Sequence, residues 1–346
     1  MARFPRYRTG DADLDQQIGE LIAKVGDVRD SDLLFEMTVS AVRLARDHAS
    51  RGDMKLANAA LKEMRYAFAV FEPYRSARKA AIFGSARTTR DDPLYEQTVA
   101  LAQGLAEADW MVITGAGPGI MEAGIEGAGA ANSFGVSIRL PFEAATTQFL
   151  ADDPKLVNFR YFFTRKVTFV KEANAFVLLP GGFGTLDEGF ELLTLVQTGK
   201  APPAPIILLD VPGGTFWLTW MEFVERELRA RGYISPEDVN LVTITDDVSV
   251  ALEEITRFYR NYHSLRFVGG DLVLRMQHLP SPGAIDQLNE DFADILVSGK
   301  IEPAEVSKAE LGDRDVPDLA RLKMRFDRHS YSRLRELINR LNNDDD

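Results

Sequence analysis

The stretch from residue 162 to 200 constrains the fold of this chain more than any other part of it. It contains an apolar segment, NAFVLL, whose unbroken hydrophobicity is typical of a strand buried on both faces in a parallel sheet. Pro180 ends that strand, three of the next four residues are glycines that permit tight turns, and residues 185–188 open a helix. Bare glycine backbone at the start of a helix is typical of an anion-binding site.

Strands and helices alternate from Lys79 onward, which predicts an α/β fold with a parallel sheet flanked by helices, over residues 76–263. The expected strands are residues 80–83, 110–114, 133–138, 175–179, 206–209 and 241–244. The expected helices are residues 94–108, 120–131, 165–172, 186–198, 215–231 and 248–261.

Helical extensions are expected on both sides of this domain. Residues 1–75 carry apolar side chains at helical spacing, which predicts three helices that serve as a cap or an interaction arm. Within residues 264–346 we expect a hairpin around Gly269, Gly270 and Asp271, followed by helices over 285–297 and 317–341. The last helix is amphipathic, and the acidity of the whole chain favours docking or oligomerisation over membrane binding.

The composition disfavours several classes of function. The 346 residues include no cysteine, which rules out disulfides, thiolate zinc sites and a cysteine nucleophile. A formal net charge of −12 would repel a nucleic-acid polymer, so a bound nucleotide is expected to be a small molecule. No signal-peptide core or membrane-spanning run is visible, which predicts a cytoplasmic protein without a membrane partner. We expect no metal site, because the histidines lie in different regions, at His48, His263, His278 and His329.

Three predicted strand-to-helix junctions carry small or glycine residues, at residues 84–86, 115–119 and 181–184. In an open α/β sheet these junctions all lie beyond the carboxyl ends of the strands, where ligands bind. One glycine after a strand is commonly just a tight turn, whereas three converging junctions indicate a binding site.

The second junction does not match a dinucleotide fingerprint. A G-x-G-x-x-G motif starting at Gly115 requires a glycine where Ile120 stands, and no acidic residue lies near Arg139 to bind a ribose diol. A P-loop also fails, because Lys200 is followed by Ala201 instead of serine or threonine. The sequence therefore disfavours NAD and a P-loop nucleotide site.

Several ordered motifs resemble those of one known family. Residues 180–188, PGGFGTLDE, resemble the PGGxGTxxE signature of the LOG (Lonely Guy) family of cytokinin-activating nucleoside 5′-monophosphate phosphoribohydrolases, often mislabelled lysine decarboxylases. Further segments resemble its longer bacterial branch: IFGSAR (82–87), TGAGPGIMEA (114–123), LPFE (140–143), FFTRK (162–166) and LVQTGK (195–200). The resemblance covers residues 79–261, and it implies a Rossmann-like sheet and hydrolysis of a base–ribose bond to free base and ribose 5-phosphate.

The resemblance also implies a catalytic pair, an arginine and the glutamate that closes the signature, which fall on Arg165 and Glu188. A carboxylate suits this reaction, because it can stabilise an oxocarbenium-like transition state and activate water. Alternatively, Glu188 could be an acid favoured at a helix start. Asp187 suits that role better, because adjacent helix residues point about 100° apart and one of the two can face the site. For Lys166, substrate binding and a solvated surface position have equal weight.

The phosphate is expected to bind backbone amides of the glycine turns and the hydroxyls of Ser85 and Thr185, although Thr185 could also be the helix N-cap. Arg139 lies just past a strand end, where a binding residue and a surface arginine are both plausible. The full set of expected substrate-binding residues is Ser85, Gly117, Gly119, Glu122, Arg139, Lys166, Gly181, Gly182, Gly184 and Thr185.

We therefore expect an enzyme that hydrolyses AMP or an N6-modified AMP without a cofactor. The family resemblance suggests a homodimer or a larger homo-oligomer. The alternative is a non-catalytic nucleotide-binding carrier or sensor, against which the presence of both Arg165 and Glu188 argues. A decarboxylase using pyridoxal phosphate would need a lysine placed to form a Schiff base, and none is identifiable.

Overall fold

The structure is a computed structural model that describes residues 7–139, 153–313 and 316–343. The chain divides into two compact units, Met1–Arg65 and Tyr66–Asp346. The helices predicted at the N-terminal end are present as α1 (Ala12–Ala23), α2 (Ser31–Arg46) and α3 (Arg51–Phe71). Within the first unit, buried isoleucines of α1 pack against buried Phe35 and Val39 of α2.

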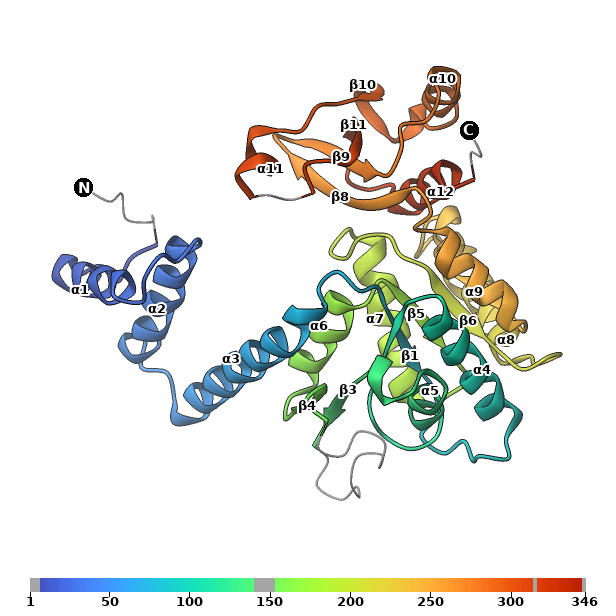
Figure 1. Cartoon of the computed structure of the whole chain (residues 1–346), viewed down its shortest axis with the longest axis horizontal. Helices are drawn as coiled ribbons and strands as arrows, with labels where there is room; N and C mark the ends of the chain where they lie inside the picture. The colour runs from blue at the N-terminus through green and yellow to red at the C-terminus, as the bar shows by residue number, and fades with distance from the viewer. Residues whose placement is uncertain (1–6, 140–152, 314–315, 344–346) are drawn as a thin grey trace. The chain divides into compact units, whose positions relative to one another are not determined.

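A parallel sheet forms the centre of the second unit (Figure 1). Within the described ranges it has seven strands in the order β4-β3-β2-β1-β5-β6-β7, and every neighbouring pair is parallel. The strands are β1 (Lys79–Phe83), β2 (Met111–Thr114), β3 (Ser133–Ile138), β4 (Leu156–Phe159), β5 (Ala175–Leu178), β6 (Ile206–Leu209) and β7 (Thr243–Thr245). This arrangement confirms the predicted α/β class with a Rossmann-like sheet.

Two hydrophobic cores cover the two faces of this sheet. In β5, Phe176 and Leu178 enter one core, and Ala175 and Val177 enter the other. The first core also holds side chains of α3, α6 (Phe162–Glu172), α7 (Phe183–Gln197) and α8 (Phe216–Phe223). The second holds side chains of α4 (Pro93–Glu107), α5 (Ile120–Ala128) and α9 (Val248–Arg257). Burial on both faces explains why β5 is an unbroken apolar run in the sequence.

The strand order places a topological switch point at the middle of the sheet. The chain runs from β1 to β2, β3 and β4 on one side, and then returns to β5, β6 and β7 on the other. The loops that leave the carboxyl ends of β1 and β5 therefore diverge, and such a divergence is where open α/β sheets bind ligands.

Some predicted boundaries in this domain are wrong. Strand β4, in which Val157 and Phe159 are buried, is a short edge strand that was not expected from the sequence. The strand expected at 241–244 begins two residues later as β7, because a 3-10 helix, η5 (Pro236–Leu241), occupies the preceding residues. The helix expected over 215–231 is α8 followed by a π-helix, η4 (Val224–Arg229).

The C-terminal part of the second unit contains a further sheet, antiparallel and four-stranded in the described residues, with the order β10-β11-β9-β8. Its elements are β8 (Tyr262–Val268), β9 (Asp271–Met276), α10 (Pro282–Asp291), β10 (Leu296–Pro303), α11 (Lys308–Asp313), β11 (Ala320–Phe326) and α12 (Tyr331–Leu341). Strands β8 and β9 form the predicted hairpin, and its two turn glycines have φ of 60° and 100°, which favour glycine.

The two helices predicted after this hairpin are partly wrong. Helix α10 ends at Asp291, and residues 296–303 form β10 instead of a helical end. The first half of the helix expected over 317–341 is β11, in which Leu322, Met324 and Phe326 are buried at alternate positions while cationic side chains separate them. This alternation has the two-residue period of a strand. In a window that also includes α12, the leucines of that helix at helical spacing make the whole segment look helical.

Helix α12 docks on the Rossmann-like part of the second unit. Buried Arg335 donates to the Asn240 carbonyl at 2.6 Å and to Glu254 Oε1 at 3.0 Å. Tyr331 lies so close to Gly199 that a Cβ there would come within 1.9 Å of its ring. None of the helices in the described ranges combines the length and the apolarity needed to cross a membrane.

Candidate active site

The backbone of Ser85, just after β1, joins the three glycine junctions. Its N–H donates to the Pro180 carbonyl at 3.3 Å, and its carbonyl accepts from the Ile120 N–H at 3.1 Å. A Cβ at Gly119, where φ is +70°, would lie 2.4 Å from the Ser85 carbonyl oxygen, and one at Gly181 would lie 3.0 Å from the Ser85 nitrogen. Glycine is therefore required at both positions for the loops to meet.

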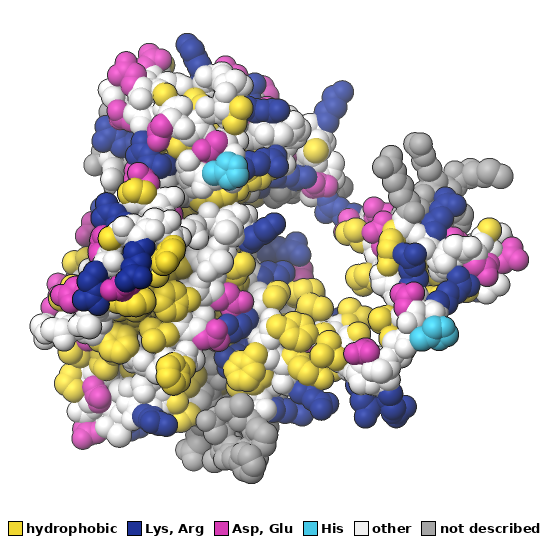
Figure 2. Space-filling model, turned by 180° about the vertical axis from the view of Figure 1, so that it is seen from behind, with side chains coloured by type: hydrophobic (Ala, Val, Ile, Leu, Met, Phe, Trp, Pro, Cys, Tyr) yellow, Lys and Arg dark blue, Asp and Glu magenta, His cyan; other side chains and the backbone are white. Residues whose placement is uncertain are grey.

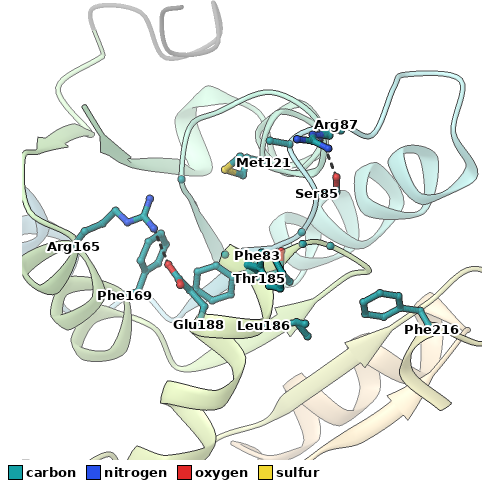
Figure 3. A pocket seen from close by; sticks show the side chains of 17 residues that line it. Phe83, Ser85, Arg87, Met121, Arg165, Phe169, Thr185, Leu186, Glu188 and Phe216 are labelled. Atoms are coloured by element: carbon teal, nitrogen blue, oxygen red, sulfur yellow. Dashed lines mark hydrogen bonds and ion pairs between the residues drawn. The ribbon is translucent and has the colours of Figure 1, made fainter. Parts of the chain in front are cut away.

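A cavity of about 720 Å³ opens at this meeting point (Figure 3). Its volume lies within the range of small-molecule sites, roughly 300 to 1,000 Å³. The described lining residues come from the end of β1, from all three junctions and from α5, α6, α7 and α8. They are Phe83, Gly84, Ser85, Ala86, Arg87, Gly115, Met121, Arg165, Phe169, Gly181, Gly182, Phe183, Gly184, Thr185, Leu186, Glu188 and Phe216.

The N-terminus of α7 faces this cavity. The helix begins at Phe183 with Gly182 as its N-cap, and no side chain of the described residues caps it. The first N–H groups of a helix have no intrahelical acceptor and carry partial positive charge. Thr185, buried in the first turn, is therefore not the N-cap, and its side chain lines the cavity instead.

Arg165 of α6 and Glu188 of α7 form an ion pair inside the cavity. Arg165 Nη2 donates to Glu188 Oε1 at 2.8 Å, and the two side chains are 13% and 8% exposed. The guanidinium also lies over the rings of Phe162 and Phe169, at 4.9 and 5.9 Å from their centroids. These contacts hold the pair in one orientation, as Figure 3 shows for Arg165, Glu188 and Phe169.

Burial and charge act on Glu188 in opposite directions. Burial raises the pKa of its carboxyl above the usual range, while the cations of Arg165 and Lys166 lower that pKa and offset part of the effect. Asp187 points elsewhere: its side chain is 61% exposed and pairs with Lys166 at 2.7 Å. Of these two adjacent acids, Glu188 lines the cavity and Asp187 is not among its described lining residues.

The chain is similar to known proteins over parts of its length. Residues 117–255 match a family model described as "Possible lysine decarboxylase". The chain is 38% identical over 72 residues to the Arabidopsis thaliana cytokinin riboside 5′-monophosphate phosphoribohydrolase LOG1, covering 21% of this chain and 32% of that one. It is 29% identical over 99 residues to the probable cytokinin riboside 5′-monophosphate phosphoribohydrolase LOGL3 of Oryza sativa subsp. japonica, covering 29% and 44%.

Over part of its length the chain is therefore similar to proteins of the LOG family. It spans less than half the length of these two curated relatives. Among solved structures, the molybdenum cofactor binding protein of Rippkaea orientalis matches with a TM-score of 0.38 and 21% identity, over 52% of this chain and 96% of that chain. At this TM-score the likeness carries no argument about function.

Five of the residues expected to bind substrate lie outside the described lining of the cavity: Gly117, Gly119, Glu122, Arg139 and Lys166. At Gly117 a Cβ would come within 2.6 Å of Met121 Cε, and Gly119 provides the close approach to Ser85, so both glycines serve local packing. Glu122 pairs with Arg90 at 2.7 Å. The substrate contacts expected for Gly117, Gly119 and Glu122 remain predictions.

Arg139 and Lys166 differ in their surroundings. Arg139 is exposed at the end of β3, next to the LPFE segment (140–143), which lies outside the described residues. Lys166 pairs with Asp187 and Glu191 and lies 3.9 Å from Glu188 Oε2. Lys166 is therefore placed to act on the carboxylate of Glu188, without lining the cavity itself.

Some residues that line the cavity are not among those expected from the sequence. Arg87 and Met121 belong to the IFGSAR and TGAGPGIMEA motifs, and this membership is a signal that could have identified them. Phe183 occupies the variable position of the signature and is 93% exposed. Phe216 enters from α8, far along the chain, and only the fold brings it to the cavity.

Proposed function

We propose that this protein hydrolyses the N-glycosidic bond of a nucleoside 5′-monophosphate, AMP or an N6-modified AMP, to a free base and ribose 5-phosphate. The observation that carries the proposal is the buried Arg165–Glu188 ion pair in a cavity at the switch point of the sheet. The names of the LOG relatives, which are cytokinin riboside 5′-monophosphate phosphoribohydrolases, support the same reaction class.

In this proposal the phosphate binds at the start of α7. The amides of the glycine turn at residues 181–184, together with the hydroxyls of Ser85 and Thr185, offer hydrogen-bond donors, and the helix dipole favours negative charge there. Binding of the phosphate fixes the ribose, so that the anomeric carbon faces Glu188. Binding energy from this remote group then serves to orient the reacting bond.

Glu188 acts at the reacting carbon in the proposed mechanism. The electrons of the bond from C1′ to the base leave with the base, and Glu188 stabilises the positive charge that develops on the ribose. The oxygen of a water molecule adds to C1′ and Glu188 accepts one of its protons, while the departing base takes up a proton from solvent; Glu188 then returns its proton to solvent. Arg165 keeps Glu188 ionised and oriented, since it holds the carboxylate at 2.8 Å.

The proposal includes a homodimer or a larger homo-oligomer in the cytoplasm. Figure 2 shows hydrophobic side chains gathered on one face of the molecule. Large apolar side chains on α6, α7 and α8 are exposed: Phe162, Phe163, Val167, Phe183, Phe190, Phe216, Leu218 and Phe223. Extended exposed apolar surface is typical of interaction sites, and a second copy of the chain would bury it.

The requirement for a phosphate tests this function. Purified protein should release adenine from AMP, whereas adenosine should be cleaved at least about a hundredfold more slowly, because loss of the phosphate removes binding energy that orients the bond. Chromatography of the two reactions measures both rates. Equal rates on AMP and adenosine would contradict the proposed phosphate site.

A further inference from the structure

Most of the basic side chains at the cavity and next to it have their charge balanced by carboxylates. Arg165 is bonded to Glu188 at 2.8 Å. Lys166 lies 2.7 Å from Asp187 and 2.9 Å from Glu191. Neither cation is therefore available as an unpaired charge for a substrate anion.

Two arginines on the loop after β1 differ in this respect. Arg90 is paired with Glu122 at 2.7 Å and with Glu126 at 3.1 Å. Arg87 lines the cavity, and in the described part of the chain no carboxylate lies within ion-pair distance of its guanidinium. Arg87 is thus a cavity-lining cation whose charge the described residues leave unbalanced.

The loop that carries Arg87 is held in place. The N–H of Arg87 donates to Ser85 Oγ at 3.1 Å, and the backbone of Ser85 is bonded to both other glycine junctions. Figure 3 shows Ser85 and Arg87 at one side of the cavity and Arg165 with Glu188 at the other. The cavity therefore has a carboxylate on one side and an unbalanced guanidinium on the opposite side.

We propose that Arg87 binds the 5′-phosphate of the substrate and so makes the cavity selective for nucleoside monophosphates over nucleosides. This inference rests on the proposed function and assigns the cation that its phosphate site requires. A phosphate monoester carries a charge of about −2 at neutral pH, and an arginine can bind two of its oxygens at once. With the phosphate at Arg87, the ribose lies across the cavity and its anomeric carbon is directed to Glu188.

The test compares Arg87→Gln with Arg90→Gln, a matched control three residues along the same loop. Every protein, including the parent, also carries Glu188→Gln, so that AMP is not consumed while its affinity is measured by calorimetric titration. Arg87→Gln should weaken AMP binding by at least about tenfold and leave adenosine binding within about twofold, because a charge-assisted contact to the phosphate alone is lost. Arg90→Gln should change neither affinity, and Arg87→Lys should recover part of the AMP affinity.

Unchanged AMP affinity in Arg87→Gln would overturn the inference, as would an equal loss of AMP and adenosine binding or the same effect in Arg90→Gln. The readout is binding, so it is separate from the proposed reaction. If AMP binding depends on Arg87 while the wild-type protein releases no adenine, the proposed hydrolysis fails and the phosphate assignment stands.

Discussion

Glu188 combines burial with two neighbouring cations. Burial raises the pKa of its carboxyl, and Arg165 at 2.8 Å and Lys166 at 3.9 Å lower that pKa. A carboxylate that must stabilise positive charge has to be ionised, so the cations determine the pH range in which the proposed reaction can occur.

Lys166→Ala should move the acid limb of the pH profile of kcat/KM to higher pH. Lys166 favours the ionised form of Glu188 and lowers its pKa, so its removal raises that pKa and activity is lost sooner as the pH falls. Lys171→Ala on the same helix, whose side chain pairs with Glu172 instead, should leave the limb in place. Titration of AMP itself is the same in all reactions and cannot cause a difference between the variants. An acid limb that stays in place or moves to lower pH in Lys166→Ala would contradict the role assigned to Lys166.

At the scale of residues, the sequence predicts side chains whose direction follows from helix geometry. Glu188 and Asp187 are adjacent on one helix; Glu188 lines the cavity, whereas Asp187 is 61% exposed and pairs with Lys166. Gly117 and Glu122 could not be placed in this way. Gly117 packs against Met121 in the first turn of α5, and Glu122 pairs with Arg90 of the loop after β1, a contact that only the fold creates.

At the scale of elements, the junction around Ser85 depends on glycine at position 119. Gly119→Ala should lower the free energy of unfolding by about 1 to 3 kcal/mol, because the backbone there is left-handed and the new Cβ would lie 2.4 Å from the Ser85 carbonyl oxygen. It should also lower kcat/KM for AMP, since the Ser85 loop has to shift. Urea unfolding measures the stability change.

The matched control for this prediction is Gly283→Ala in the first turn of α10, where a Cβ would meet no atom within 4 Å. This change should be neutral or slightly stabilising. A Gly119→Ala protein as stable and as active as the Gly283→Ala protein would contradict the account of the junction.

The sequence predicts the elements of the Rossmann-like sheet well because strands buried on both faces are continuous apolar runs, as in β5. It fails at β11, where alternating cations and apolar residues form a strand directly before the amphipathic helix α12. Pairing of β11 with β9 determines this strand, and that long-range contact is not visible in a local window.

At the scale of the whole molecule, the exposed apolar side chains of α6, α7 and α8 predict self-association. Light scattering after size-exclusion chromatography should give at least twice the 38.5 kDa mass of one chain. Phe163→Asp should lower the mass, because it places a charge on this surface, whereas Tyr233→Asp, on the exposed turn after η4, should leave it unchanged. A wild-type protein that is monomeric at micromolar concentration would contradict the proposed oligomer.

The account of the whole molecule as a hydrolase depends on Glu188, and release of adenine from AMP by wild type and Glu188→Gln tests it most directly. Glutamine keeps the size of the side chain but cannot accept a proton or oppose an oxocarbenium charge. The account predicts that wild type converts AMP to adenine and ribose 5-phosphate, that Glu188→Gln still binds AMP, and that its kcat falls by about 10² to 10⁴. Asp187→Asn, on the exposed side of the same turn, should do far less. Adenine release by Glu188→Gln within a few-fold of wild type would contradict the role assigned to Glu188. No adenine release from either protein would contradict the proposed hydrolysis and favour a nucleotide carrier.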